Sequence, residues 1–144
     1  MTASSEISAA FQHPIRIYWE DTDAGGIVFY ANYLKFFERA RTEWLRSLGL
    51  QQQALRTETG GMFVVTDTQT RHHRPARLDD LLLVTTRLTE LGRASMTLEQ
   101  VAWLGSDGER VCLCEGQIRI GWVDASAMKP MRIPATLIDK LHNA

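Results

Sequence analysis

The chain has 144 residues, of which 44% are hydrophobic, and this length and composition fit one globular domain with a sizeable core. Sixteen Lys and Arg residues against seventeen Asp and Glu residues give a net charge of −1. Such a balance provides no global field that would favour nucleic acid or an anionic membrane surface.

The first residues carry no recognisable targeting signal. Residues 1–12 contain no Lys or Arg and no continuous apolar run, which argues against a secretory signal peptide. No later run approaches the ~20 apolar residues of a membrane span. We therefore expect a cytoplasmic protein with no membrane span. Residues 1–13 are mostly small or polar and predict a flexible lead-in, which leaves residues 14–144 as the single domain.

Residues 15–20 have the period of a half-buried strand. Ile15, Ile17 and Trp19 alternate with polar or amphipathic neighbours and are expected to share the inner face. This strand would deliver Asp21 and Asp23 into a turn that contains two adjacent glycines.

A long amphipathic helix follows this turn. Apolar residues recur at spacings of three and four, and charged residues occupy most of the other positions. The apolar stripe consists of Tyr33, Leu34, Phe37, Ala40, Trp44, Leu45 and Leu48. Asn32 is a good N-cap residue, and Gly49 provides the stop at the C-terminal end. This helix is the best-specified element of the sequence, and we expect its aromatic face to be buried.

The remainder of the chain reads mainly as strands. The composition and alternation predict strands over residues 62–73, 80–91, 93–104 and 109–123, with a hairpin turn at 106–108. Residues 51–59 form either a short helix or an irregular turn, and residues 136–142 form a closing helical turn. One long helix followed by strands with short connections predicts an α+β domain with a curved antiparallel sheet wrapped around the helix, which is the hot-dog fold.

The two cysteines and two adjacent histidines lie in predicted strands. Cys112 and Cys114 are two residues apart, so both should face the same way, and we interpret them as small buried hydrophobes. His72 and His73 should point to opposite faces and so cannot share one metal ion. We assign them a surface or edge role. The sequence also lacks the common zinc motifs, and we predict no metal site.

Two acidic residues precede the helix, and a calcium loop is one interpretation of them. Asp21, Asp23 and Gly26 match positions one, three and six of an EF-hand loop. Positions five and twelve, however, hold Gly25 and Asn32, which do not supply the required side-chain ligands. A strand rather than a helix also precedes the loop, so calcium binding is rejected.

The same residues suit chemistry on a carbonyl group. Asp23 can act as a nucleophile or as a general base, or it can simply form an Asx-turn. Gly25 and Gly26 allow close approach of a ligand, and the N–H groups that follow, beginning with Ile27, can turn toward one point. The N-terminus of the helix favours a developing oxyanion. Asp21 is interpreted as structural, through bonds to backbone N–H groups of the turn.

Residues 21–33, which read Asp-Thr-Asp-Ala-Gly-Gly-Ile-Val-Phe-Tyr-Ala-Asn-Tyr, and their continuation to residue 49 resemble the signature of the 4-hydroxybenzoyl-CoA thioesterase-type hot-dog enzymes. Within that family the chain is most similar to the Tol-Pal-associated acyl-CoA thioesterases. Residues 74–80, Arg-Pro-Ala-Arg-Leu-Asp-Asp, and residues 128–130, Met-Lys-Pro, also fit that subfamily. The resemblance covers roughly residues 14–134.

The resemblance implies hydrolysis of an acyl-CoA thioester with Asp23 as the catalytic carboxylate. Whether Asp23 acts as nucleophile, through a mixed anhydride, or as base for a water stays open. The resemblance also implies that the backbone N–H of Tyr30 polarises the thioester carbonyl. Many members of the Tol-Pal-associated subfamily carry His at this position, so a side-chain role for Tyr30 is not carried over. No cofactor is expected beyond the coenzyme A of the substrate.

Coenzyme A carries phosphates, so a basic site should lie near the mouth of the pocket. Arg93 is the first candidate, and Ser95 belongs to the same turn, because the resembling enzymes place basic residues there. Arg71, Arg74 and Arg77 are alternatives.

A single sheet wrapped on one helix leaves open edges and apolar surface, so a homodimer is the minimum expected assembly. The resemblance suggests a homotetramer and contact with acyl carrier protein. A non-catalytic module that binds acyl thioesters or acyl carrier protein is the alternative function. A dehydratase ranks last, because the His-Phe-Pro type of motif is absent. The preferred acyl chain is left open.

Overall fold

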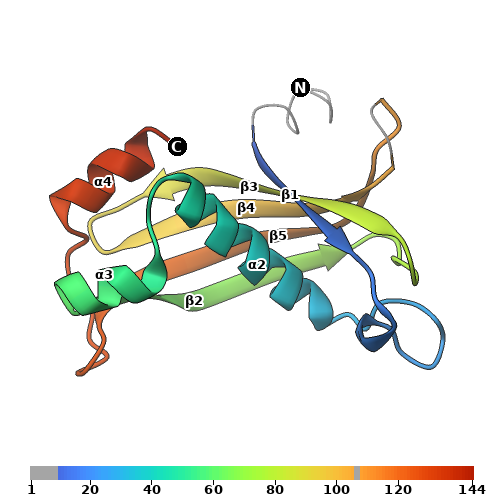
Figure 1. Cartoon of the computed structure of the whole chain (residues 1–144), viewed down its shortest axis with the longest axis horizontal. Coiled ribbons are helices and arrows are strands. Elements are labelled where there is room, and N and C mark those ends of the chain that lie inside the picture. Colours follow the sequence, from blue (N-terminus) through green and yellow to red (C-terminus); the bar gives the residue numbers. More distant parts are fainter. Residues whose placement is uncertain (1–9, 106–107) are drawn as a thin grey trace.

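The computed structural model describes residues 10–105 and 108–144 (Figure 1). In chain order the elements are β1 (Phe11–Arg16), a 3-10 turn η1 (Trp19–Asp21), α2 (Asn32–Ser47), α3 (Gln52–Thr59), β2 (Gly61–His72), β3 (Leu81–Leu91), β4 (Ser95–Leu104), β5 (Val111–Asp124) and α4 (Ala135–His142). Residues 51–59, for which the sequence left two alternatives, thus form a helix. Most of the predicted hairpin turn at 106–108, and residues 1–9 of the predicted lead-in, lie outside the described residues.

All five strands form one antiparallel sheet in the order β1-β3-β4-β5-β2. The sheet curls around α2, which crosses one of its faces, and α4 packs near one end (Figure 1). This arrangement confirms the predicted α+β hot-dog architecture. In the described part of the chain, no helix is long and apolar enough to cross a membrane.

The core lies between α2 and the inner face of the sheet. The buried residues of α2 are Tyr33, Phe36, Phe37, Ala40, Trp44 and Leu45. The helix approaches β5 closely, because a Cβ atom on Gly116 would lie 2.9 Å from the ring of Phe37. The predicted stripe was wrong at one position. Leu34 is 47% exposed, whereas Phe36, which was not part of the predicted stripe, is fully buried.

One polar side chain is fully buried beneath the helix. Gln100 of β4 donates from Nε2 to the carbonyl of Phe37 at 2.8 Å and to Thr86 Oγ1 at 2.9 Å. Its Oε1 accepts a hydrogen bond from Arg41 at 3.2 Å. Because a buried amide is costly unless it is hydrogen-bonded, these three bonds fix the position of α2 on the sheet.

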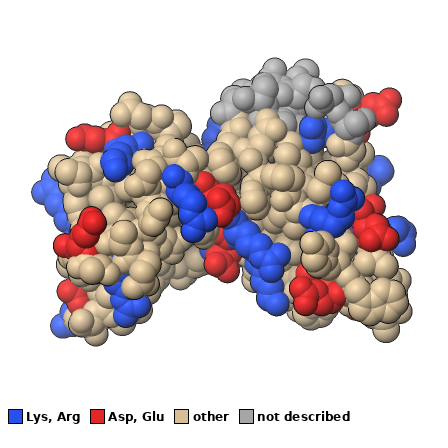
Figure 2. All heavy atoms as spheres, viewed as in Figure 1, with Lys and Arg blue, Asp and Glu red and all other residues tan. Residues whose placement is uncertain are grey.

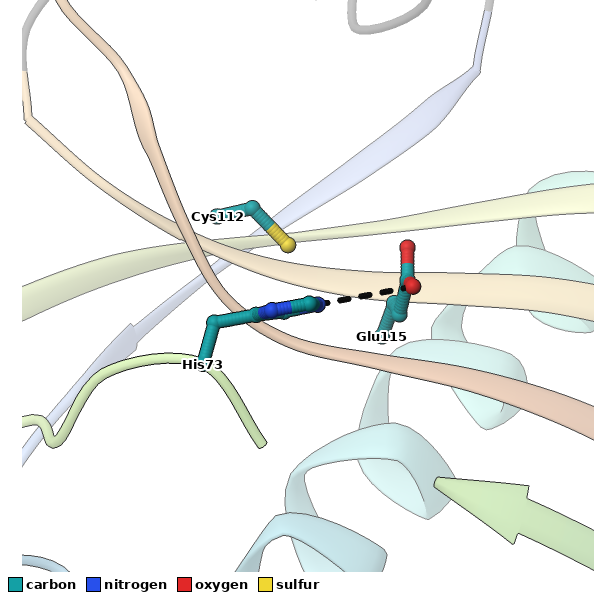
Figure 3. A group of neighbouring side chains, drawn as sticks. All are labelled: His73, Cys112 and Glu115. Carbon is teal, nitrogen blue, oxygen red and sulfur yellow. Dashed lines mark ion pairs between the residues drawn. The ribbon is translucent and has the colours of Figure 1, made fainter. Parts of the chain in front are cut away.

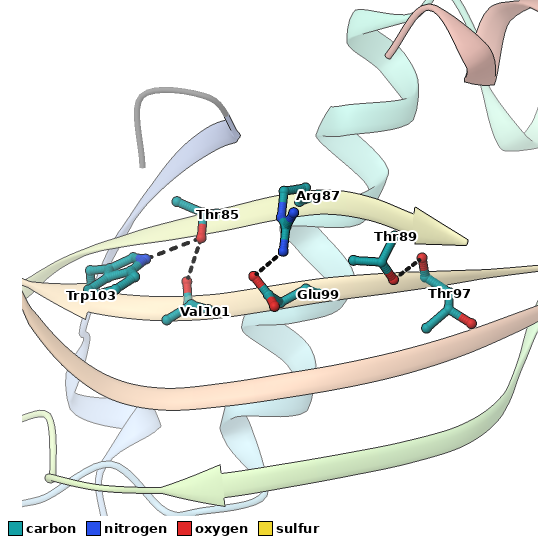
Figure 4. Close-up of polar contacts among 7 residues, drawn as sticks. All are labelled: Thr85, Arg87, Thr89, Thr97, Glu99, Val101 and Trp103. Atoms are coloured by element: carbon teal, nitrogen blue, oxygen red, sulfur yellow. Dashed lines mark hydrogen bonds and ion pairs between the residues drawn. The ribbon is translucent and has the colours of Figure 1, made fainter. Parts of the chain in front are cut away.

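Polar contacts connect β3 and β4 on the outer face of the sheet (Figure 4). Trp103 Nε1 donates to Thr85 Oγ1 at 3.2 Å, and Arg87 forms an ion pair with Glu99 at 3.2 Å. Positive and negative side chains are also interspersed over the face that Figure 2 shows. The surface therefore agrees with the near-neutral net charge of the sequence.

The first strand begins earlier than the sequence predicted. β1 starts at Phe11, so part of the expected lead-in of residues 1–13 belongs to the sheet. Ile15 and Ile17 are buried as expected, but Trp19 is 79% exposed. The prediction failed there because the chain leaves the sheet after Arg16 and turns through η1, which breaks the alternation.

The prediction that both cysteines face the same way was wrong. Cys114 is buried in the main core, whereas Cys112 packs with Trp103 in a separate small cluster. The cause is a β-bulge. Trp103 pairs with Cys112 and the adjacent Ala102 pairs with Cys114, which leaves Leu113 as an extra residue in β5. An extra residue shifts the alternation by one position, so the two thiols lie on opposite faces.

Candidate active site

The loop before α2 is a compact hairpin. Thr22 and Val28 form an antiparallel bridge, and the backbone N–H of Asp23 donates to the carbonyl of Ile27 at 2.9 Å. The N–H of Gly26 donates a hydrogen bond to the carbonyl of Asp23 at 3.0 Å. Gly26 has a φ of 79°, which a residue with a Cβ rarely adopts. The sequence Asp-Ala-Gly-Gly therefore forms a tight turn with a defined shape.

The carboxylate of Asp23 is held at the tip of this hairpin. Its Oδ1 accepts a hydrogen bond from the N–H of Gly25 at 2.8 Å, and the residue is exposed. A Cβ atom at Gly25 would lie 3.2 Å from that oxygen, so a larger residue would crowd the carboxylate. The Asx-turn weighed from the sequence is thus present. It orients one carboxylate oxygen and is compatible with a catalytic role for the other.

Asp21 is structural, as predicted. It is buried, and its Oδ2 accepts a hydrogen bond from the N–H of Tyr18 at 2.8 Å. Its carbonyl accepts from the N–H of Phe29 at 3.1 Å and from the side chain of Asn32 at 2.8 Å. Asn32 was predicted to be the N-cap, but Ala31 occupies that position and Asn32 is the first residue of α2. The amide of Asn32 ties the loop to the helix instead.

Tyr30 lies at the N-terminal end of α2. Its carbonyl accepts a long hydrogen bond from the N–H of Tyr33 at 3.4 Å. In the described part of the chain, no hydrogen bond uses the backbone N–H of Tyr30 as donor. This N–H and the positive end of the helix dipole are therefore available to an oxygen that gains negative charge. The side chain of Tyr30 is 67% exposed.

Residues 74–80 hold the hairpin against the helix. The N–H of Val28 donates to the carbonyl of Ala76 at 2.9 Å, and Ile27 forms a bridge with Arg77. The N–H of Ala76 donates to the phenolic oxygen of Tyr33 at 3.2 Å. Burial raises the pKa of Tyr33 above its ordinary value, so the phenol is neutral. The helical spacing predicted Tyr33 only as a core residue, and that spacing contains no signal for this polar contact.

His72 contributes a ring to the same region. Its ring centroid lies 5.4 Å from that of Tyr33 and 6.1 Å from that of Tyr30. His73 points to the other face, where Nε2 lies 3.4 Å from Glu115 Oε1. The two histidines therefore face opposite ways, as predicted. The proximity of His72 to the loop could not be read from the sequence, because it depends on how β2 crosses the start of α2.

Arg93 and Ser95 are not brought together with Asp23 within one chain. The β3–β4 turn that carries Arg93 lies beside α4, whereas the loop before α2 lies at the opposite end of the sheet (Figure 1). Arg93 and Arg132 line a hollow of about 630 Å³. The backbone of Ser95 closes the turn, since its carbonyl accepts from the N–H of Gly92 at 2.7 Å.

A small cavity of about 150 Å³ lies between α2 and the strands β2, β4 and β5. Glu38 and Arg41 of the helix and Gln52 of α3 supply its polar lining. The apolar lining consists of Trp44, Leu45, Phe63, Val64, Val65, Met96, Leu98 and Ile120. Apolar walls with a few polar groups are typical of a site for a small apolar ligand.

Comparison with known proteins identifies the family. The model of the thioesterase superfamily matches residues 25–111, which include part of the Asp23 loop, the helix α2 and residues 74–80. The chain belongs to the thioesterase superfamily. The match to the family model covers more than half of the chain and agrees with the hot-dog architecture. This protein is therefore a thioesterase.

Two curated relatives are similar over almost their full length. The chain is 40% identical over 133 residues to the acyl-CoA thioesterase YbgC of Haemophilus influenzae, which covers 92% of this chain and 95% of the relative. It is 40% identical over 128 residues to the acyl-CoA thioester hydrolase YbgC of Escherichia coli, which covers 89% of this chain and 92% of the relative. The predicted family resemblance is thereby confirmed.

Solved structures agree with the fold. A probable thioesterase from Bartonella henselae has a TM-score of 0.78 and 34% identity, with 85% of this chain and 98% of that chain covered. A 4-hydroxybenzoyl-CoA thioesterase variant in complex with 4-hydroxybenzoyl-CoA has a TM-score of 0.85 at 20% identity, with 92% of this chain and 98% of that chain covered. The latter likeness concerns the fold alone.

Proposed function

We propose that this thioesterase hydrolyses acyl-CoA to a free acid and coenzyme A, with Asp23 as the reacting carboxylate. The observation that carries the proposal is the hairpin before α2, which holds the exposed carboxylate of Asp23. Close to it in sequence, the backbone N–H of Tyr30 donates no hydrogen bond in the described part of the chain. The similarity to the YbgC acyl-CoA thioesterases supports the substrate class.

Two routes use the same geometry. In the first, Asp23 attacks the thioester carbonyl carbon, the coenzyme A thiolate leaves, and water hydrolyses the mixed anhydride. In the second, Asp23 removes a proton from a water that attacks the carbonyl directly. Both routes place negative charge on the carbonyl oxygen, which the N–H of Tyr30 stabilises. Removal of one such donor typically costs about 100-fold to 1,000-fold in kcat.

We further propose that two copies of the chain complete the site. The two parts assigned to one substrate, Asp23 and the Arg93–Arg132 hollow, lie at opposite ends of a single chain. β2 is an edge strand that is exposed from Val65 to His72, and Trp19 and Tyr30 expose aromatic rings nearby in the loop region. Pairing of two β2 edges would cover the open strand and the apolar surface. A homotetramer would join two such dimers.

The acyl group would enter the apolar cavity beside α2. Phe63 and Val65 of that cavity belong to the edge strand β2, so the partner copy would form its remaining wall. Acyl carrier protein, which presents the same thioester arm, is proposed as a second donor of the acyl group. A cytoplasmic location stays a prediction from the sequence, and a link to the Tol-Pal system stays a prediction that rests on the family resemblance.

The proposal is tested by hydrolysis assays with short, long and aromatic acyl-CoAs, in which the release of the coenzyme A thiol is measured. We expect turnover by the parent protein and a loss of about 100-fold to 10,000-fold in Asp23→Asn. Glu58→Gln is the matched control, because Glu58 is an exposed carboxylate of α3 far along the chain from the loop. No turnover of any acyl-CoA by the parent would instead favour the non-catalytic binding module.

Arg93→Ala tests the assignment of the phosphate site. Loss of a charge that contacts only the coenzyme A phosphates should raise KM for acyl-CoA about tenfold or more with little change in kcat. A short acyl thioester that lacks the nucleotide should be hydrolysed equally well by the parent and the variant. An unchanged KM for acyl-CoA would place the phosphates elsewhere.

A further inference from the structure

A second group of chemically reactive side chains lies on the outer face of the sheet, away from the helix. His73, Cys112 and Glu115 point toward one another from the end of β2 and from β5 (Figure 3). The donor atoms of the three side chains all lie within 4.8 Å of one another. They belong to neither the hairpin before α2 nor the cavity beside the helix.

The bulge in β5 creates this arrangement. Cys112 and Glu115 are three residues apart, and in a regular strand an odd spacing places two side chains on opposite faces. The extra residue Leu113 shifts the alternation, so both side chains point outward. Bulges re-aim side chains in this way and are common beside functional sites.

The same bulge also anchors the third side chain. The carbonyl of Leu113 accepts hydrogen bonds from the N–H of His73 at 2.7 Å and from the N–H of Arg74 at 3.2 Å. His73 is thereby fixed beside β5, although it lies just beyond the end of β2. Three side chains of different chemistry thus converge because one local feature of the backbone positions all of them.

We propose that His73, Cys112 and Glu115 form a binding site for a zinc-type divalent cation. Imidazole nitrogen, thiolate sulfur and carboxylate oxygen are the three side-chain ligands of Zn²⁺ in proteins. A thiolate disfavours Mg²⁺ and Ca²⁺, which require oxygen ligands. The site is independent of the proposed acyl-CoA hydrolysis and lies on the opposite face of the sheet from α2.

The spacing of the donor atoms suits tetrahedral coordination. Zinc bonds of about 2.0–2.3 Å at tetrahedral angles place donor atoms about 3.4–3.7 Å apart. His73 Nε2 and Glu115 Oε1 are 3.4 Å apart already, and the thiol of Cys112 needs to approach by about 1 Å at most. The cation takes the place of the thiol proton, which passes to the solvent.

The coordination is completed from the solvent. The side chains of His73 and Glu115 are 39% and 48% exposed, so water reaches the fourth position. Three protein ligands and one water leave an exchangeable site rather than a closed structural one. Because the ligands join the end of β2 to β5, a bound cation stabilises the folded protein. At about 100 times its Kd, Zn²⁺ should raise Tm by about 5–10 °C.

Titration of the full chain with Co²⁺ tests the site, because tetrahedral Co²⁺ with a thiolate ligand absorbs in the visible and shows a thiolate charge-transfer band. We expect one Co²⁺ per chain and displacement by Zn²⁺. Cys112→Ser should abolish the charge-transfer band, and His73→Asn and Glu115→Gln should each weaken binding about 10-fold to 100-fold.

Cys114→Ala is the matched control, since it removes the other cysteine of β5, and it should leave the cobalt spectrum unchanged. The Tm of each variant without metal shows that it is folded. Absence of the charge-transfer band in the parent, or its persistence in Cys112→Ser, would overturn the proposal. A spectrum that disappears in Cys114→Ala while Cys112 is intact would overturn it as well.

Discussion

The hydrogen bond between Tyr33 and Ala76 connects the start of α2 to residues 74–80, the segment that holds the Asp23 hairpin. Tyr33→Phe removes only the hydroxyl and keeps the ring, so the ring contacts with Phe36 and His72 stay in place. The substitution leaves the N–H of Ala76 without its acceptor in a position where the residue is 0% exposed.

The expected cost follows from that burial. A typical hydrogen bond contributes about 1 kcal/mol, and a buried donor left without a partner costs about 1–3 kcal/mol. We therefore expect the free energy of unfolding to fall by about 1–3 kcal/mol. Because the carbonyl of the same Ala76 accepts from the N–H of Val28, the hairpin should also loosen. A small misplacement of Asp23 would lower kcat by about tenfold or more.

Urea unfolding of the parent and the variant at equal protein concentration measures the change in free energy. Tyr18→Phe is the matched control, because Tyr18 is 61% exposed and its hydroxyl has access to water. That control should change the free energy of unfolding by less than about 0.5 kcal/mol. A Tyr33→Phe variant as stable as the control would refute the role assigned to this hydrogen bond.

Two further predictions concern stability. Gln100→Met keeps the length of the side chain but leaves Arg41 without its hydrogen bond to the buried amide. Urea unfolding should show a free energy of unfolding that is lower by about 2–4 kcal/mol. A change as small as that of the exposed control Gln117→Met would contradict this prediction. Burial raises the pKa of the Cys114 thiol from 9.0 to about 12, so the folded state favours the neutral thiol. The free energy of unfolding should therefore fall as pH rises from 9 to 12, by up to about 4 kcal/mol from this group, and Cys114→Ala should lose less over that range. Equal losses in parent and variant would exclude Cys114 as the cause.

Much of the fold could be predicted because local periodicity matches the burial. The spacing of apolar residues from Tyr33 to Leu45 places α2 within one or two residues, and Gly49 ends it with a φ of 80°. The four strands after the helix also lie close to their predicted bounds. The hairpin with Asp23 was recognised because its tight turn needs a backbone conformation that glycine adopts readily. Such a turn is therefore visible in the sequence as a pair of glycines.

The errors arose where packing overrides the local pattern. Trp19 continues the alternation of β1 in the sequence, but the chain has already left the sheet at that residue. The bulge at Leu113 reverses the facing of Cys112, and no residue type in β5 signals it. The assignment of Arg93 to the phosphate site stays a prediction. Its separation from Asp23 within one chain could not be read from the sequence, because the topology places the β3–β4 turn and the start of α2 at opposite ends of the sheet.

Binding and a single turnover of acyl-CoA by Asp23→Asn test the central claim most directly. The amide keeps the shape of the side chain and can still accept the hydrogen bond from Gly25, so the loop and the substrate site should remain intact. The account predicts a Kd for acyl-CoA within about threefold of the parent value, with the single-turnover rate reduced by about 100-fold or more. A variant that binds acyl-CoA and cleaves it at the parental rate would contradict the assignment of Asp23 as the reacting group.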